Sequence, residues 1–96
     1  MQMVADSFEI PVHALMERTR AVRVAEPRQV AMTLIREHSN LSLVDVGSVF
    51  RLDHGTVIHA IKAVRRRRSA CILLDTQIEE ISRQVRYQFS LAGKFA

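Results

Sequence analysis

The expected fold is decided by residues 42–64, SLVDVGSVFRLDHGTVIHAIKAV. Apolar or small residues recur there at helical spacing in two groups, separated by a short break at residues 51–53. Because that break leaves little slack, two short helices must meet at a steep angle. The pattern predicts a helix-turn-helix, whose second helix normally lies in the major groove of DNA. The two groups are Leu43, Val46, Gly47 and Phe50, then Val57, Ala60, Ile61 and Val64.

Both helices of this pair have a capping residue at the expected start. Ser42 precedes the first helix, and Asp45 three residues later makes a short variant of the capping box. Asp53 precedes the second helix, where its carboxylate can accept hydrogen bonds from exposed backbone N–H groups. The caps and the apolar spacing therefore predict the same helix boundaries.

The rest of the chain is expected to add four more helices. Pro11 and Pro27 are expected at first helical positions, which suit proline, and Asp75 is expected to cap the last helix. Residues 19–25 show no period and are predicted to form a basic loop. The chain is thus expected to be one all-α domain, residues 1–96: a compact bundle of about six helices with a frayed tail at 92–96. The four added helices are residues 1–8, 12–18, 27–38 and 76–91.

The composition favours an anionic partner. The net charge is +4 with a pI near 10.2, and twelve of the fourteen basic residues are arginine, which suits contacts to phosphate or guanine. The single Cys71 excludes an internal disulfide and fits a reducing compartment. No signal peptide is recognised, and the longest apolar run, residues 70–74, is too short to span a bilayer. A cytoplasmic location without a membrane partner is expected.

Three segments point to a known family: AEPRQVAM at residues 25–32, SLVDVG at 42–47 and DHGTVIHA at 53–60. In this order and spacing they resemble the C-terminal DNA-binding domain of the bacterial replication initiator DnaA, whose signature is F-G-G-R-D-H-[ST]-T-V-x-H-A. The resemblance runs from about residue 4 to about residue 85. It implies a Trp-repressor-like fold that binds double-stranded DNA at the nucleoid, in replication initiation or transcriptional regulation.

The resemblance also implies roles for single residues. Arg20 would reach into the minor groove, and the start of the second helix of the pair would read bases in the major groove. The residues implied in base contacts are Arg20, Asp53, His54, Gly55 and Thr56. Those implied near phosphates are Arg18, Arg28, Gln29, Arg36, Leu43 and Lys62.

The chain departs from the family pattern in two places. Between Phe50 and Asp53 it has Arg51-Leu52, one residue fewer than the family's Gly-Gly-Arg, so the turn has changed. Gly55 stands where the family has Thr or Ser, and loss of one good base contact reduces discrimination by about 1–3 kcal/mol. The departures predict an altered or relaxed site preference.

The sequence does not favour an enzyme or a cofactor. The phosphate-binding pattern G-x-x-x-x-G-K-[ST] does not occur, so nucleotide binding is not expected and the family's ATPase domain has no counterpart. The chain would be a stand-alone or isolated domain. No catalytic triad or dyad stands out, and no pair of histidines at i and i+4 with a carboxylate suggests a metal site.

Several residues also have an ordinary structural interpretation. In that interpretation Asp53 is simply a helix cap, His54 simply a polar residue of the first turn, and Thr56 simply part of the packing within the helix. His59 is expected to be packed or half-buried, and Cys71 to be a small buried residue. The arginines at 65–68 can be a solvated helix end, although at most two of them can face one phosphate strand.

A second class of function is a protein-interaction module that keeps the fold without reading DNA. Its partner, or a second copy, would contact either the exposed face of the last helix or residues 91–95. RNA binding is less favoured because the chain has few aromatic residues for stacking on bases. The face in question is formed by Glu79, Glu80, Arg83 and Arg86.

Overall fold

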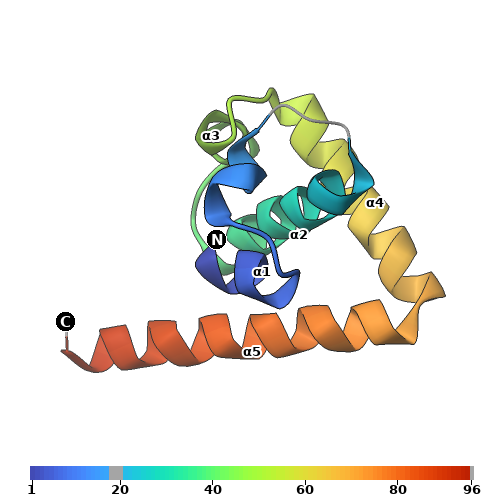
Figure 1. The fold of residues 1–96 in the computed structure, drawn as a ribbon. Coiled ribbons are helices and arrows are strands. Elements are labelled where there is room, and N and C mark those ends of the chain that lie inside the picture. Colours follow the sequence, from blue (N-terminus) through green and yellow to red (C-terminus); the bar gives the residue numbers. More distant parts are fainter. Residues whose placement is uncertain (18–20, 96) are drawn as a thin grey trace.

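Helices form the fold throughout the part of the chain that the structure describes (Figure 1). The computed structural model describes residues 1–17 and 21–95, and of residues 88–95 only the backbone. No strand occurs in these ranges, and the expected all-α bundle of about six helices is confirmed. In chain order the elements are α1 (Gln2–Ser7), the 3-10 helix η1 (Val12–Met16), α2 (Val22–His38), α3 (Leu43–Val49), α4 (His54–Ala70) and α5 (Ile72–Phe95).

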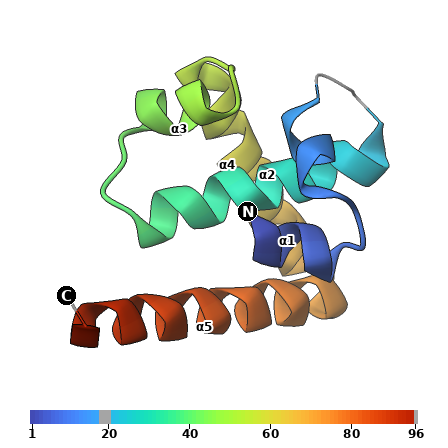
Figure 2. The same ribbon diagram turned by 60° about the vertical axis from the view of Figure 1, so that its left-hand side comes forward.

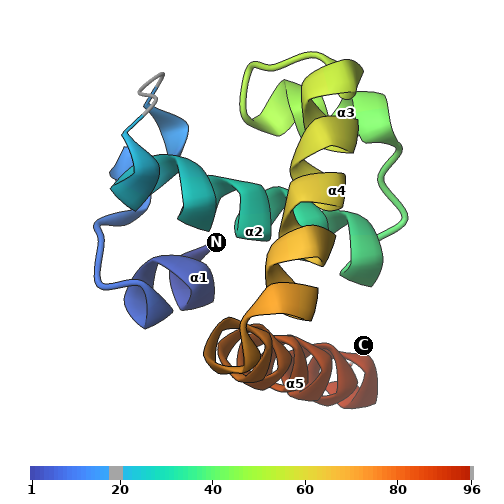
Figure 3. The same ribbon diagram turned by 90° about the vertical axis from the view of Figure 1, so that its right-hand side faces the viewer.

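Helices α2 and α4 cross at the centre and make the most extensive helix–helix contact of the described chain. Helix α3 packs at the start of α4, and α5 runs along the opposite end of the molecule, beside α1 (Figures 2 and 3). The end of η1 and the start of α2 lie on the α3 side of the molecule in all three views. The helix pair, the end of η1 and the start of α2 are therefore all remote from α5.

The two apolar groups in residues 42–64 face one core. Val46 and Val57 are completely buried, Phe50 is 3% exposed, and Leu43 and Ile61 pack against them from partly exposed positions. The core fixes the angle between α3 and α4 because it takes side chains from both helices and from α2 and α5. Those from α2 and α5 are Val30, Ala31, Met32, Leu34, Ile78 and Ile81.

Helix α2 begins five residues before the position expected for it. The backbone N–H groups of Val24 and Ala25 donate to the carbonyl oxygen of Ala21 over 3.0 and 2.8 Å, so the first turn forms ahead of Pro27. Pro27 lies inside the helix and buried, where it removes one main-chain hydrogen bond. The prediction of Pro27 at the first position was wrong, and residues 22–25 of the expected basic loop are helical.

Helix α5 follows α4 after the single residue Cys71. The N–H of Cys71 donates to the carbonyl oxygen of Arg67, and the N–H of Asp75 already donates to Cys71, so α5 starts at Ile72. Asp75 is thus a first-turn residue and not the cap. The helix continues to Phe95, past the expected end at 91, while fraying of 92–96 stays a prediction. Cys71 is exposed, so its expected burial was wrong.

Helix η1 is a 3-10 helix that ends at Met16, with Pro11 outside it as the N-cap, so the first helical position expected for Pro11 was wrong. The N–H of Ala14 donates to the carbonyl oxygen of Pro11 over 3.0 Å, as the tighter 3-10 turn requires. Within the described ranges, none of the helices has the length and apolar character needed to cross a membrane.

Candidate nucleic-acid interface

The turn between α3 and α4 is closed by backbone hydrogen bonds. The N–H of Leu52 donates to the carbonyl oxygen of Gly47 over 2.8 Å, and that of Arg51 to Ser48 over 3.2 Å. This pair of bonds is a Schellman motif, in which the residue after the C-cap adopts a left-handed conformation. Arg51 has that conformation, with φ of 58°. The turn therefore keeps the geometry of a glycine-containing helix end although an arginine occupies it.

The predicted capping of both helices is confirmed. The N–H of Asp45 donates to Ser42 Oγ over 3.1 Å, and the N–H of Ser42 donates back to Asp45 Oδ2 over 3.4 Å. At the start of α4, Asp53 Oδ1 accepts from both the backbone N–H and the hydroxyl of Thr56, each over 2.8 Å. Leu43 is half-buried directly after the Ser42 cap. The caps hold the starts of both helices in defined positions.

The hydrogen bonds at the Asp53 cap lower the pKa of its carboxyl. The backbone N–H of Thr56 contributes most, followed by its hydroxyl, and the nearby His54 and His59 add a smaller effect. Asp53 is exposed. It is therefore an ionised acceptor at neutral pH, with Oδ1 occupied by the cap, while Oδ2 accepts no hydrogen bond from the described residues.

The three residues after Asp53 lie at the accessible start of α4. His54 and Thr56 are exposed, and Gly55 is partly exposed. A Cβ on Gly55 would meet only Asp53 Oδ1, at an ordinary 3.5 Å, so space does not require glycine here. Because the Thr56 hydroxyl donates to Asp53, its oxygen can only accept a further hydrogen bond, and its methyl group can touch a base. Base contacts by these residues stay predictions.

The face of α4 opposite the core carries a line of exposed cations. Val57, Ala60 and Val64 are buried, whereas Lys62 and Arg66 are exposed on the other side. His59 is exposed on this side too, so its expected packing was wrong. Its apolar sequence neighbours suggested burial, but they point in other directions around the helix.

Two of the residues implied near phosphates are tied into the fold. Arg28 Nε donates to the carbonyl oxygen of Leu15 over 3.1 Å, and Gln29 Oε1 accepts from Arg67 Nη2 over 2.6 Å. Both are partly buried, and burial lowers the pKa of Arg28 although Glu17 opposes that effect. The structure brings Arg28 and Gln29 into contacts that fix η1 and α4 against α2.

The other implied positions differ in their surroundings. Arg36 is exposed near the end of α2, and its Nη1 donates to the carbonyl oxygen of Leu41 over 3.1 Å. It therefore holds the loop that leads into α3. Arg18 and Arg20 lie outside the described residues, so the minor-groove assignment stays a prediction.

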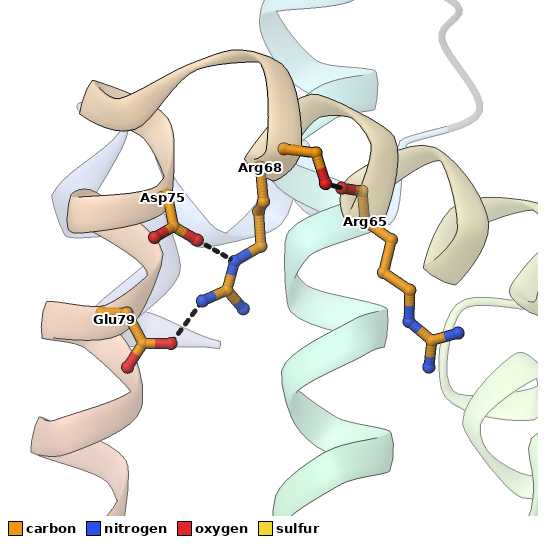
Figure 4. A network of polar contacts seen from close by, with 5 residues as sticks. Arg65, Arg68, Asp75 and Glu79 are labelled. Carbon is orange, nitrogen blue, oxygen red and sulfur yellow. Dashed lines mark hydrogen bonds and ion pairs between the residues drawn. The ribbon is translucent and has the colours of Figure 1, made fainter.

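The four adjacent arginines of α4 divide into two pairs. Arg67 Nε lies 3.5 Å from Glu26 Oε1, and Arg68 contacts Asp75, at 2.7 Å, and Glu79. Partial burial lowers the pKa of Arg68, but the hydrogen bonds that Arg68 donates to Asp75 and Glu79, together with the negative charges of these acids, outweigh this and raise it. Figure 4 shows Arg68 directed at α5 and the Arg65 side chain directed away from it.

A shallow groove of about 320 Å³ lies between α1 and the second half of α5. Tyr87 on its edge is 66% exposed. The described residues hold no cluster of three His, Cys, Asp or Glu side chains placed to bind a metal ion. The groove is lined by Met3, Glu80, Arg83, Gln84 and Tyr87.

Comparison with known proteins gives one consistent family. Residues 1–64 match the family described as bacterial dnaA protein helix-turn-helix. The chain is 37% identical, over 88% of its length, to the chromosomal replication initiator protein DnaA of Bdellovibrio bacteriovorus and covers 18% of it. It is likewise 37% identical over 86% of its length to DnaA of Thermoanaerobacter pseudethanolicus, covering 19%. The chain thus spans less than a fifth of these relatives, and it belongs to the bacterial DnaA helix-turn-helix family.

Proposed function

We propose that this domain binds double-stranded DNA selectively by placing the start of α4 in the major groove. The observation that carries the proposal is the exposed, capped start of α4, set at a fixed angle by the turn after α3 and remote from α5. Membership of the DnaA helix-turn-helix family supports it, since the matched relatives are named replication initiators. The domain would act at the nucleoid, in replication initiation or transcriptional control.

In this mechanism the first turn of α4 reads bases. The ionised Asp53 accepts a hydrogen bond from a cytosine amino group, and His54 contacts a purine N7 or a phosphate. The Thr56 methyl group meets a thymine methyl. Because Asp53 is held by Thr56, its free oxygen approaches the base edge in one orientation only.

Backbone contacts position α4 for that reading. Lys62 is exposed on the outer face of α4 and Arg36 near the loop before α3, so both have access to phosphates. Arg28 and Gln29 act mainly by holding η1 and α4 in place, with their exposed atoms near the phosphate backbone. Arg18 and Arg20 complete the footprint, Arg20 in the minor groove.

The site preference is proposed to differ from that of family members with the full signature. Gly55 offers no side chain where those members have a hydroxyl and methyl group. The turn of Arg51 and Leu52 is one residue shorter, so α4 meets the groove at a changed angle. Recognition is therefore relaxed at the base pair facing Gly55.

Selection of bound duplexes from a random pool tests this function. The expected result is enrichment of a common motif, followed by binding of that duplex more tightly than random DNA and with a steep salt dependence. Affinity no better than millimolar for every duplex at low salt would overturn the proposal. A His54→Ala variant should bind the selected duplex less tightly and lose preference at one base pair, whereas Arg86→Ala on α5 is the matched control.

A second candidate is self-association through α5, favoured by the charge order along its exposed face. Glu79 and Glu80 precede Arg83 and Arg86, so two antiparallel copies would place acids opposite arginines. The groove beside Tyr87 would lie at the same contact. Sedimentation equilibrium without DNA tests it: a dimer that Arg83→Glu weakens supports the contact, and a monomer at high concentration excludes it.

A further inference from the structure

The run of arginines at 65–68 contains one that the fold leaves available on the outer face of α4. Arg67 is held by Glu26 and Gln29, and Arg68 by Asp75 and Glu79. Among the described residues, no hydrogen bond or ion pair engages the guanidinium of Arg66 or that of Arg65. Both are exposed. Half of the run therefore stabilises the fold, and half is free to contact a ligand.

Arg66 is the member of this free pair that lies in line with the proposed DNA surface. At about 100° per residue, Gly55, Lys62 and Arg66 fall within about 40° of one another around α4. They stand opposite the buried Val57 and Val64. Arg65 is turned about 100° from Arg66, toward the side of α4.

The position of Arg66 along the helix places it above the bases. It follows Gly55 by eleven residues, a rise of about 16 Å, and Lys62 by one turn, about 6 Å. The major groove is about 8.5 Å deep, so a helix that lies inclined in it, with its start at the base edges, carries a residue about 16 Å further along to the level of the sugar–phosphate backbone. A guanidinium suits bidentate contact with a phosphate there.

We propose that Arg66 binds a DNA backbone phosphate one helical turn beyond Lys62, so that the DNA-contacting face of α4 extends over more than three turns. The proposal rests on the function above, in which α4 occupies the major groove. The contact adds affinity for any sequence because a phosphate carries no base information. It also assigns different roles to neighbouring arginines: Arg66 to DNA, and Arg67 and Arg68 to the fold.

Salt titrations with Arg66→Ala test the contact. Loss of one phosphate contact should reduce the slope of log K against log salt by about 0.9, so two proteins that bind equally at about 1 M salt should differ by about eightfold near 0.1 M. The affinities for selected and for random duplexes should fall by the same factor. Arg65→Ala, an adjacent exposed arginine on another side of α4, is the matched control and should keep most of the slope. Arg66→Lys should restore it.

The outcomes separate this inference from the proposed function. Wild-type binding with a slope that Arg66→Ala leaves unchanged, or that both alanine variants reduce equally, overturns the Arg66 contact alone. Absence of wild-type binding to any duplex overturns both. Because Arg66 is exposed and its guanidinium makes no hydrogen bond or ion pair within the described residues, the melting temperature of Arg66→Ala should equal that of wild type, which excludes unfolding as the cause.

Discussion

Gly47 and Leu52 approach so closely that a side chain on Gly47 would collide with the turn. The N–H of Leu52 donates to the carbonyl oxygen of Gly47 over 2.8 Å, and a Cβ on Gly47 would lie 2.4 Å from the carbonyl oxygen of Leu52. The obstacle is backbone, so it cannot rotate away. The contact between α3 and the segment entering α4 therefore depends on glycine at this position.

Replacement Gly47→Ala is expected to destabilise the domain by about 2–3 kcal/mol, because the turn must open to admit the methyl group. Urea unfolding followed by circular dichroism measures the loss. Gly55→Ala is the matched control: its Cβ meets only Asp53 Oδ1 at 3.5 Å, and alanine favours helix, so stability should rise by up to about 1 kcal/mol. Equal stability of the two variants would contradict the collision.

Arg51→Gly is expected to stabilise the domain by about 1 kcal/mol. Arg51 has φ of 58°, a left-handed conformation that glycine adopts without steric strain. Arg51→Ala removes the same side chain but keeps the strain, so the difference between the two variants isolates the backbone effect. Glu9 after α1 has φ of 57°, and Glu9→Gly should give a gain of the same sign. Equal melting temperatures for Arg51→Gly and Arg51→Ala would contradict the strain.

The Asp53 cap is expected to make stability fall in acid. Hydrogen bonds from Thr56 lower the pKa of Asp53 in the folded state, so folding favours the ionised form. The contribution of Asp53 to the free energy of unfolding is therefore complete above its unfolded-state pKa of about 3.9. It is lost as the pH falls through the lower pKa of the folded state. Melting temperatures between pH 6 and 2 measure it. Asp53→Asn keeps an acceptor that does not titrate in this range, so its melting temperature should fall less between pH 6 and 2. If the melting temperatures of the two proteins fall in parallel, ionisation of Asp53 does not contribute to stability.

Arg68→Ala is expected to destabilise the junction of α4 and α5 by about 1 kcal/mol, because Arg68 joins two acids from the next helix. The Arg68 side chain is only 21% exposed, so added salt should screen these ion pairs only in part, and the destabilisation should persist at high salt. Arg83→Ala is the control, since Arg83 pairs with Glu80 of the same helix and its side chain is 64% exposed. This variant should lose less than about 0.5 kcal/mol of unfolding free energy. Equal losses would show that bridging two helices adds nothing.

Local patterns predicted those parts of the fold that local contacts determine. The spacing of Val57, Ala60 and Val64 predicted the buried face of α4, and Ser42 and Asp53 predicted the helix starts, because a cap bonds only residues within one turn. The predicted start of α2 was wrong because it relied on a local rule alone. The preference of proline for a first turn is a local rule. Here it is overridden by the burial of Pro27 and by the earlier helical turn, in which the carbonyl oxygen of Ala21 accepts hydrogen bonds.

The remaining features depend on contacts between distant residues. The break at Cys71 has no glycine or proline to mark it, and the pairing of Arg68 with Asp75 and Glu79 joins α4 to α5 across it. Likewise, the internal hydrogen bond of Gln29 requires Arg67, thirty-eight residues away. The base-contacting candidates at the start of α4 were predictable as exposed because they follow a cap, but their contacts with DNA require a partner to be tested.

Gly55→Thr is expected to sharpen the site preference. A Cβ has room at this position, and Gly55 lies in the first turn of α4 on the side away from the core, so the added methyl and hydroxyl groups would face the base edges. One added base contact should improve discrimination by about 1–3 kcal/mol at one base pair. Parallel duplex selections with wild type and Gly55→Thr measure it, with Gly55→Ala to separate the effect of helix stability. Gly55→Ser, which supplies the hydroxyl without the methyl group, tells which of them reads the base. If all four proteins select the same motif with the same information at every position, residue 55 does not face the DNA, and the relaxed preference proposed from it is wrong.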